Sequence, residues 1–157
     1  MTIYVDADGC PKPAKEILFR AAERTLVPLV FVANRALWIP DSPLFKRVVV
    51  GSGLDVADRW IEENARAGDL VITADIPLAA KVVEKDALAL SPHGEIFDRE
   101  TVGERLSVRN FMQELRTGGV STGGPAPFSN ADRERFANAL NRLLLKKPRQ
   151  KPAQSSG

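Results

Sequence analysis

Short runs of apolar residues alternate along the chain with longer segments in which apolar residues recur every three or four positions. A short apolar run bounded by glycine, proline or acidic residues is typical of a strand buried on both faces, whereas the longer spacing is typical of one face of a helix. The runs predict strands over residues 3–5, 28–33, 45–50, 70–73 and 87–90. The spacing predicts helices over residues 11–24, 54–65, 75–85 and 101–116, and a last helix that follows residue 129 and ends at 145.

The order of these elements predicts the fold class. Strands and helices follow one another as βαββαβαβ, and the strands are too apolar to face water, which favours an α/β protein with a mostly parallel β-sheet flanked by α-helices. Two C-terminal helices follow this sheet. Their predicted starts carry capping-box patterns, Thr101 with Glu104 and Ser129 with Asp132.

Composition narrows the class of protein further. The 157 residues fit one domain, and 44% hydrophobic and 27% charged residues are ordinary for a soluble globular protein. We expect one domain over residues 1–145 and a disordered basic tail over residues 146–157, which are rich in Lys, Pro, Gln and Ser. The net charge of +2 produces no strong overall field of the kind that marks many nucleic-acid binders.

The location of the protein is predicted from its single cysteine and its N-terminus. One cysteine, Cys10, excludes an internal disulfide and a Cys-rich zinc site, which fits a reducing compartment. No signal-peptide pattern precedes Asp6, and no apolar run approaches the length of a membrane span. We therefore expect a cytoplasmic protein without a membrane partner; the sequence does not predict its oligomeric state.

Carboxylates follow two of the predicted strands at the point where each strand ends. Asp6 and Asp8 come after the first strand, and Asp75 comes after the fourth. In open α/β sheets ligands bind beyond the carboxyl ends of the strands, so Asp6 and Asp75 should lie together if their strands are neighbours. Asp8 and Asp75 also precede helices that begin with proline, where either could be an N-cap. A carboxylate has enough lone pairs to cap a helix and bind a metal at the same time.

A further acid lies in the helix predicted over residues 54–65. Asp58 falls within the apolar stripe that includes Ala57, Ile61 and Ala65, and an acid on a buried face needs a partner or a metal. Asp55 lies on a more polar flank, where it is predicted to form a capping box with Ser52.

Together these acids form a ligand set made only of oxygen atoms. No His, Cys or Lys stands at a matching place, and hard oxygen ligands select Mg²⁺ or Mn²⁺ over zinc. Such ions typically act on phosphates, so the sequence predicts phosphodiester hydrolysis by metal-activated water. The predicted catalytic residues are Asp6, Asp58 and Asp75; the predicted metal ligands are the same three with Asp8 and Asp55.

Other positions carry weaker signals for RNA, the candidate macromolecular partner. Arg105, Arg109 and Arg116 recur on one face of a predicted helix and could follow a phosphate backbone, although a solvated face explains them equally well. The glycine-rich stretch of residues 118–127 could cradle a phosphate or pack between helices. Trp38 stands in a predicted loop, so packing is favoured while stacking on a base stays open. Cys10 is better explained as a small buried hydrophobe than as a reactive thiol.

Three stretches resemble the bacterial YaiI/YqxD family: Asp6-Ala-Asp-Gly-Cys-Pro, Gly68-Asp-Leu-Val-Ile-Thr-Ala-Asp-Ile-Pro-Leu-Ala79 and Gly118-Gly-Val-Ser-Thr-Gly-Gly-Pro-Ala-Pro-Phe128. The resemblance extends from about Thr2 to Leu145. It implies a PIN-like three-layer fold related to metal-dependent ribonucleases, in which Asp6, Asp58 or Asp55, and Asp75 would hold the metal. Cys10 departs from ordinary PIN nucleases, which need no thiol at this position.

Two other functions stay open. An Asp-x-Asp motif after the first strand also begins haloacid-dehalogenase-type phosphatases, where Asp6 would be the nucleophile and Asp8 the acid/base. Against that reaction, Cys10 stands where Thr or Val is usual, and later lysine and paired-acid motifs of that class are missing. The second alternative is a non-catalytic RNA-binding or interaction module with a residual metal site, which a weakly basic chain without aromatic-rich RNA motifs does not decide.

Overall fold

The computed structural model describes residues 1–53, 55–117 and 127–145. Its strands are β1 (Ile3–Asp6), β2 (Leu29–Ala33), β3 (Phe45–Val49), β4 (Leu70–Ile72), β5 (Leu88–Leu90) and β6 (Ile96–Phe97). Its helices are α1 (Lys12–Thr25), α2 (Val56–Asn64), α3 (Ile76–Glu84), α4 (Arg99–Thr117) and α5 (Asn130–Leu145), with a 3₁₀ turn, η1 (Ala7–Gly9), after β1. The expected tail of residues 146–157 lies outside the described residues, as do residues 118–126.

The strands form a six-stranded sheet in the order β3-β2-β1-β4-β5-β6. All neighbouring pairs are parallel except β5 and β6, which are antiparallel. The predicted α/β fold with a mostly parallel sheet is confirmed. β6 was not predicted, because two residues are too few to show a pattern and their pairing depends on the turn after β5.

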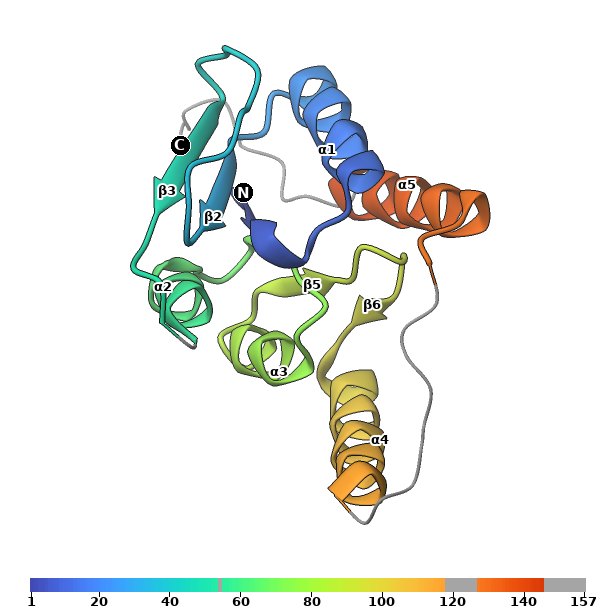
Figure 1. Cartoon of the computed structure of the whole chain (residues 1–157). Helices are drawn as coiled ribbons and strands as arrows, with labels where there is room; N and C mark the ends of the chain where they lie inside the picture. The colour runs from blue at the N-terminus through green and yellow to red at the C-terminus, as the bar shows by residue number, and fades with distance from the viewer. Residues whose placement is uncertain (54, 118–126, 146–157) are drawn as a thin grey trace.

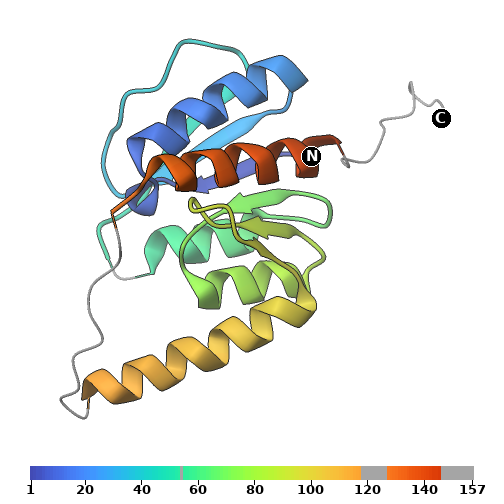
Figure 2. The ribbon, with the colours of Figure 1, turned by 90° about the vertical axis from the view of Figure 1, so that its right-hand side faces the viewer.

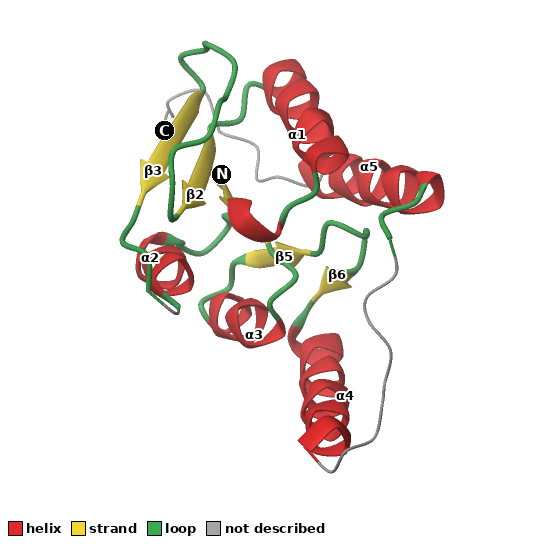
Figure 3. Cartoon of the chain, viewed as in Figure 1, coloured by secondary structure: helices red, strands yellow, loops and turns green. Residues whose placement is uncertain are grey.

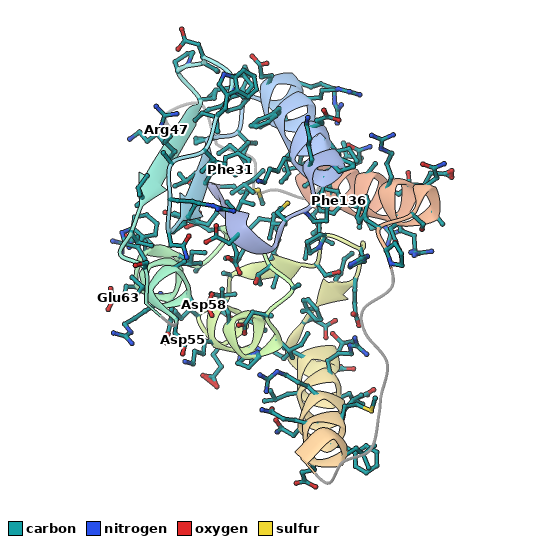
Figure 4. The ribbon with its side chains drawn as sticks, viewed as in Figure 1. Phe31, Arg47, Asp55, Asp58, Glu63 and Phe136 are labelled. Carbon is teal, nitrogen blue, oxygen red and sulfur yellow. The ribbon has the colours of Figure 1, made fainter. Side chains whose placement is uncertain are left out.

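Helices cover both faces of the sheet and make three layers (Figure 2). α1 and α5 lie on one face, and α2 and α3 lie on the other, with α4 beyond α3 (Figures 1 and 3). All residues of β2 are buried because its two faces are both covered. Phe31 of β2 and Phe136 of α5 are fully buried in the layer under α1 and α5 (Figure 4).

The opposite layer holds the helices that carry the predicted site. Ile61 of α2 and Leu78 and Val82 of α3 pack on the sheet with Val71 of β4. α4 begins beside this layer, where Val102 is buried, and then leads away from the body of the protein (Figure 1). Of the described helices, none has the length and apolar character that crossing a membrane would require.

Two of the predicted capping boxes are wrong, and both errors concern where a helix begins. α4 starts at Arg99 because Asp98 caps it: the N–H groups of Glu100 and Thr101 donate to Asp98 Oδ1 at 2.9 and 2.8 Å. Thr101 Oγ1 accepts from the Asp98 N–H at 2.9 Å, so Thr101 completes this box instead of starting one with Glu104.

The predicted box between Ser52 and Asp55 is also absent. α2 begins at Val56, and Asp55 adopts a left-handed conformation with φ of 64° and makes no side-chain cap. The box at the start of α5 is confirmed, because the Asp132 N–H donates to Ser129 Oγ at 3.1 Å and the Ser129 N–H donates to Asp132 Oδ2 at 2.9 Å.

Candidate functional site

The carboxyl ends of β1 and β4 lie side by side at the centre of the sheet. These strands are parallel neighbours, with Val5 opposite Ile72, as the prediction about Asp6 and Asp75 required. Thr73, which follows β4 and is 1% exposed, joins the two acids. Its hydroxyl donates to Asp6 Oδ2 at 3.1 Å and accepts from the Asp75 N–H at 3.0 Å.

Asp75 is held rigidly by the helix that it starts. It is the N-cap of α3, and its Oδ1 accepts the Leu78 N–H at 2.9 Å. The sequence predicted such a cap from the proline at position 77, which stands in the first turn of the helix. The cap bond uses one carboxylate oxygen and leaves further acceptor capacity for another contact.

Asp58 brings a third carboxylate to this place from α2. Its side chain lies on the part of the helix near α3, whereas Glu63 lies on the outer side (Figure 4). Burial raises the pKa of Asp58 to about 7, with smaller contributions from a hydrogen bond to the Asp75 carboxyl and from the charges of Asp75, Asp6 and Asp55. Asp58 therefore keeps its proton to a higher pH than an ordinary carboxyl does.

Asp6 is half-buried at the end of β1. Burial raises its pKa, and the negative charges of Asp75 and Asp8 raise it further, while the hydrogen bond from Thr73 lowers it. The acids at this edge therefore repel one another. We call Asp6, Asp58 and Asp75 the acid cluster.

Asp8 and Asp55 lie at the margins of the acid cluster. Asp8 is exposed, and its Oδ2 accepts the Asn34 N–H at 3.1 Å, so it fixes the chain that leaves β2. The alternative role of Asp8 as the cap of α1 is wrong, because η1 and Cys10 intervene and the N-cap position of α1 is Pro11. Asp55 is exposed and lines the same cleft as Asp58 and Asp75.

That cleft has a volume of about 300 Å³ and carries positive charge at its margin. Arg59 of α2, Lys81 of α3 and Arg109 of α4 line it together with the acids. Lys81 also forms an ion pair with Glu62 at 3.6 Å, and Arg109 donates to Gln113 at 3.2 Å. The cleft thus combines clustered carboxylates with cationic side chains that could bind a phosphate.

The three arginines singled out on α4 do not act as one group in the structure. Arg109 lines the acidic cleft. Arg105 instead forms an ion pair with Glu95 at 2.9 Å. The side chain of Arg116 lies outside the described residues.

A metal site is not preformed in the described part of the chain. No group of three or more His, Cys, Asp or Glu residues there is placed so that it could hold an ion as it stands. The donor chemistry nevertheless fits a hard cation, because every candidate ligand is a carboxylate and Asp55, Asp58 and Asp75 line one cleft.

Cys10 is buried beside the site and takes no part in the acid cluster. It is 6% exposed, and burial raises the pKa of its thiol to about 12. The prediction of a buried hydrophobe is confirmed.

Sequence reasoning missed Thr73 and the cationic side chains of the cleft. A signal for Thr73 existed, since a polar residue that ends an apolar strand needs a hydrogen-bond partner when it is buried. Arg59 and Lys81 gave no such signal, because charged residues on helix surfaces are common and their position here depends on how α2 packs beside α3.

The fold and its site define a three-layer α/β protein with carboxylates gathered at the carboxyl edge of a parallel sheet. The chain belongs to the YaiI/YqxD family, whose model is described as uncharacterized and matches residues 4–146. The resemblance drawn from the three sequence stretches is confirmed.

Relatives cover almost the whole chain. A UPF0178 protein of Bordetella petrii is 59% identical over 145 residues, which are 92% of this chain and 97% of the relative. UPF0178 proteins of Shewanella sp. strain MR-7 and Aeromonas salmonicida are 56% and 57% identical, over 92% and 93% of this chain and 95% and 97% of their own lengths. No solved structure matches the chain significantly.

Proposed function

We propose that this protein is a divalent-metal-dependent nuclease that hydrolyses phosphodiester bonds in RNA. The observation that carries the proposal is the convergence of three carboxylates: Thr73 joins Asp6 and Asp75 by hydrogen bonds, and burial together with the charges of both raises the pKa of Asp58 beside them. Carboxylates that repel one another in this way form a place where a bound cation would be favourable. The PIN-like kinship implied by the sequence motifs points to the same class of reaction.

The side chains that would hold Mg²⁺ or Mn²⁺ are Asp6, Asp58 and Asp75, with help from Asp8 or Asp55. Their oxygen-only chemistry suits either ion. When bound, such an ion would supply an activated water and neutralise charge on the phosphate.

The remaining residues of the site have supporting roles in this proposal. Thr73 orients Asp6 through its hydroxyl, and the cap bond to Leu78 holds Asp75 in place. Arg59, Lys81 and Arg109 line the cleft and would bind the phosphates on either side of the bond that is cut.

The test is cleavage of labelled single-stranded RNA by the purified full chain, with Mn²⁺ and with a chelator. Wild type should cleave only with metal, and Asp6→Asn and Asp58→Asn should lose this activity. Glu63→Gln is the matched control, because it removes a carboxylate from the outer, exposed side of α2. Melting curves recorded in parallel should show stabilisation by Mn²⁺ in wild type and Glu63→Gln but not in Asp58→Asn.

The absence of a preformed ligand group in the described residues favours one other function, a non-catalytic RNA-binding module. This module would bind RNA without cutting it, whether or not its residual site takes up a metal ion. A wild type that cleaves none of several RNA substrates and melts at the same temperature with and without Mn²⁺ would refute the nuclease, and RNA binding by the same protein would support the module.

A further inference from the structure

A second concave surface begins at Asp8, on the side of η1 next to β2 and α1. Its inner part, of about 460 Å³, is lined among others by Asp8, Lys15, Arg35 and Leu37. Its outer part, of about 560 Å³, is lined by residues of α1 and by Leu37, Trp38 and Pro40. Lys15 and Leu37 line both parts, so the two form one continuous groove, which we call the Trp38 groove.

The outer part of the Trp38 groove is built around an exposed aromatic side chain. Trp38 is 78% exposed although it lies beside apolar residues. Its neighbour Leu37 is half-buried against the core, and the Leu37 carbonyl accepts a hydrogen bond from Arg47 at 3.0 Å. The backbone that carries the indole is therefore anchored, while the indole itself stays open to a partner.

The wall opposite the loop is also firmly placed. Phe19 of α1 lines the groove, and its ring lies 5.2 Å from that of Phe31 and 5.3 Å from that of Phe45. The volume of the outer part falls within the range of about 300–1,000 Å³ that is usual for ligand sites. A fixed apolar wall and an exposed indole suit a flat aromatic group such as a nucleobase.

Positive charge surrounds this aromatic surface. Lys12, Lys15 and Arg20 line the outer part, and the ion pairs found among the described residues involve none of them. Glu16 is the acid in the same lining, and it forms an ion pair with Arg133 at 3.8 Å. The groove therefore presents unpaired cations beside an apolar platform, which is the combination that binds single-stranded nucleic acids.

We propose that the Trp38 groove binds a single-stranded nucleic acid, with Trp38 stacking on a base and Lys12, Lys15 and Arg20 contacting phosphates. The groove leads past Asp8, whose charge acts on Asp6, toward the acid cluster. This inference rests on the proposed function, because the same strand would be its substrate. It adds that the substrate is also bound at a distance from the acid cluster. It also explains a preference for single strands, since stacked neighbours cover both faces of a base inside a duplex and leave none for the indole.

Binding is measured with the full chain in excess chelator, so that no metal-dependent cleavage takes place. The probe is a fluorescein-labelled 12-nucleotide oligoadenylate RNA, followed by anisotropy, with a hairpin RNA duplex as competitor. Wild type should bind the single strand, the duplex should not compete, and Trp38→Ala should weaken binding about 5- to 150-fold. The affinity of Trp38→Phe should lie between those of wild type and Trp38→Ala.

Two further variants separate stacking from charge. Lys12→Ala should reduce the slope of log affinity against log salt by about 0.7, because one phosphate contact is lost. Trp60→Phe is the control, since Trp60 packs edge-on against Tyr4 at 6.0 Å and does not line the groove. It should leave affinity and salt slope unchanged.

The results decide between this inference and the proposed function separately. Oligonucleotide binding that depends on Trp38, in a protein that never cleaves RNA, would uphold the groove and refute the nuclease. Metal-dependent cleavage, together with equal RNA affinity in wild type and Trp38→Ala, would support the nuclease and refute the groove. A wild type that binds no oligonucleotide in chelator, or that prefers the duplex, also overturns the inference. Melting curves of Trp38→Ala should match those of wild type, because the side chain is exposed.

Discussion

Asp58→Asn should make the metal-free protein more stable, and the gain should depend on pH. The pKa of Asp58 is raised from 3.8 to about 7, first by burial and then by its contact with Asp75 and the charges around it. Between about pH 4 and 7 the folded protein therefore holds a proton that the unfolded chain has released. The free energy of unfolding therefore falls as pH rises through this window, and this loss of stability reaches its full size above about pH 7. Asparagine is neutral at every pH, so the Asp58→Asn variant does not suffer this loss of stability.

The size of this gain follows from the same pKa. Raising a carboxyl pKa from 3.8 to about 7 corresponds to about 4 kcal/mol when the environment acts in full. Because Asp58 is only partly buried, solvent screens the interaction, and we expect about 1–2 kcal/mol. For a domain of this size that is an increase of about 2–8 °C in melting temperature.

The assay is a set of melting curves in chelator at pH 4.5, 6 and 8 for wild type, Asp58→Asn and the exposed control Glu63→Gln. The difference between Asp58→Asn and wild type should be small at pH 4.5 and largest at pH 8, while Glu63→Gln stays close to wild type throughout. Adding Mn²⁺ at pH 8 should then raise the melting temperature of wild type until it approaches or exceeds that of Asp58→Asn. A difference that is equal at all three pH values, or a variant less stable at pH 8, would show that the pKa of Asp58 is not raised in the folded protein.

Four further predictions concern the fold and the burial of its side chains. Gly94→Ala should lower the unfolding free energy by about 2 kcal/mol or more in urea titrations, because Gly94 has φ of +95° and a Cβ there would lie 2.6 Å from the Arg135 carbonyl carbon; Gly103→Ala, where a Cβ has open space on α4, should instead gain about 0.5–1 kcal/mol. Phe136→Ala, at a fully buried position, should cost about 3–5 kcal/mol in the same titration. Cys10, with a pKa of about 12, should react with a thiol reagent at pH 8 at least about 100-fold more slowly in the native protein than in denaturant.

The parallel sheet could be predicted because β1, β2, β4 and β5 are short apolar runs that a polar residue soon follows. β2 shows this most clearly, since all its residues are buried and no helix-like spacing competes. β6 could not be predicted in this way, because its two residues become a strand only by pairing with β5. The start of α4 was missed for a local reason: Asp98 and Thr101 both have cap chemistry, and the burial of Val102 is needed to choose between them.

The acid cluster was predictable as far as it depends on strand ends and helix faces. Asp6 and Asp75 end apolar runs, and Asp58 interrupts an apolar stripe, so each carries a signal in its own neighbourhood. The raised pKa of Asp58 could not be foreseen, because it depends on how α2 packs beside α3. The cationic residues of the cleft depend on the same packing.

The hydrogen bond between Thr73 and Asp6 has a consequence for how the protein is made. It joins residues 67 positions apart, and a bond of the same sequence separation runs from the Thr2 N–H to Asp69 at 2.9 Å. β1 lies between β2 and β4 in the sheet. The acid cluster can therefore form only after β4 has been synthesised and has paired with β1. Contacts this distant along the chain form late and slowly. The nascent chain therefore stays without its cluster until more than the first 75 residues have left the ribosome.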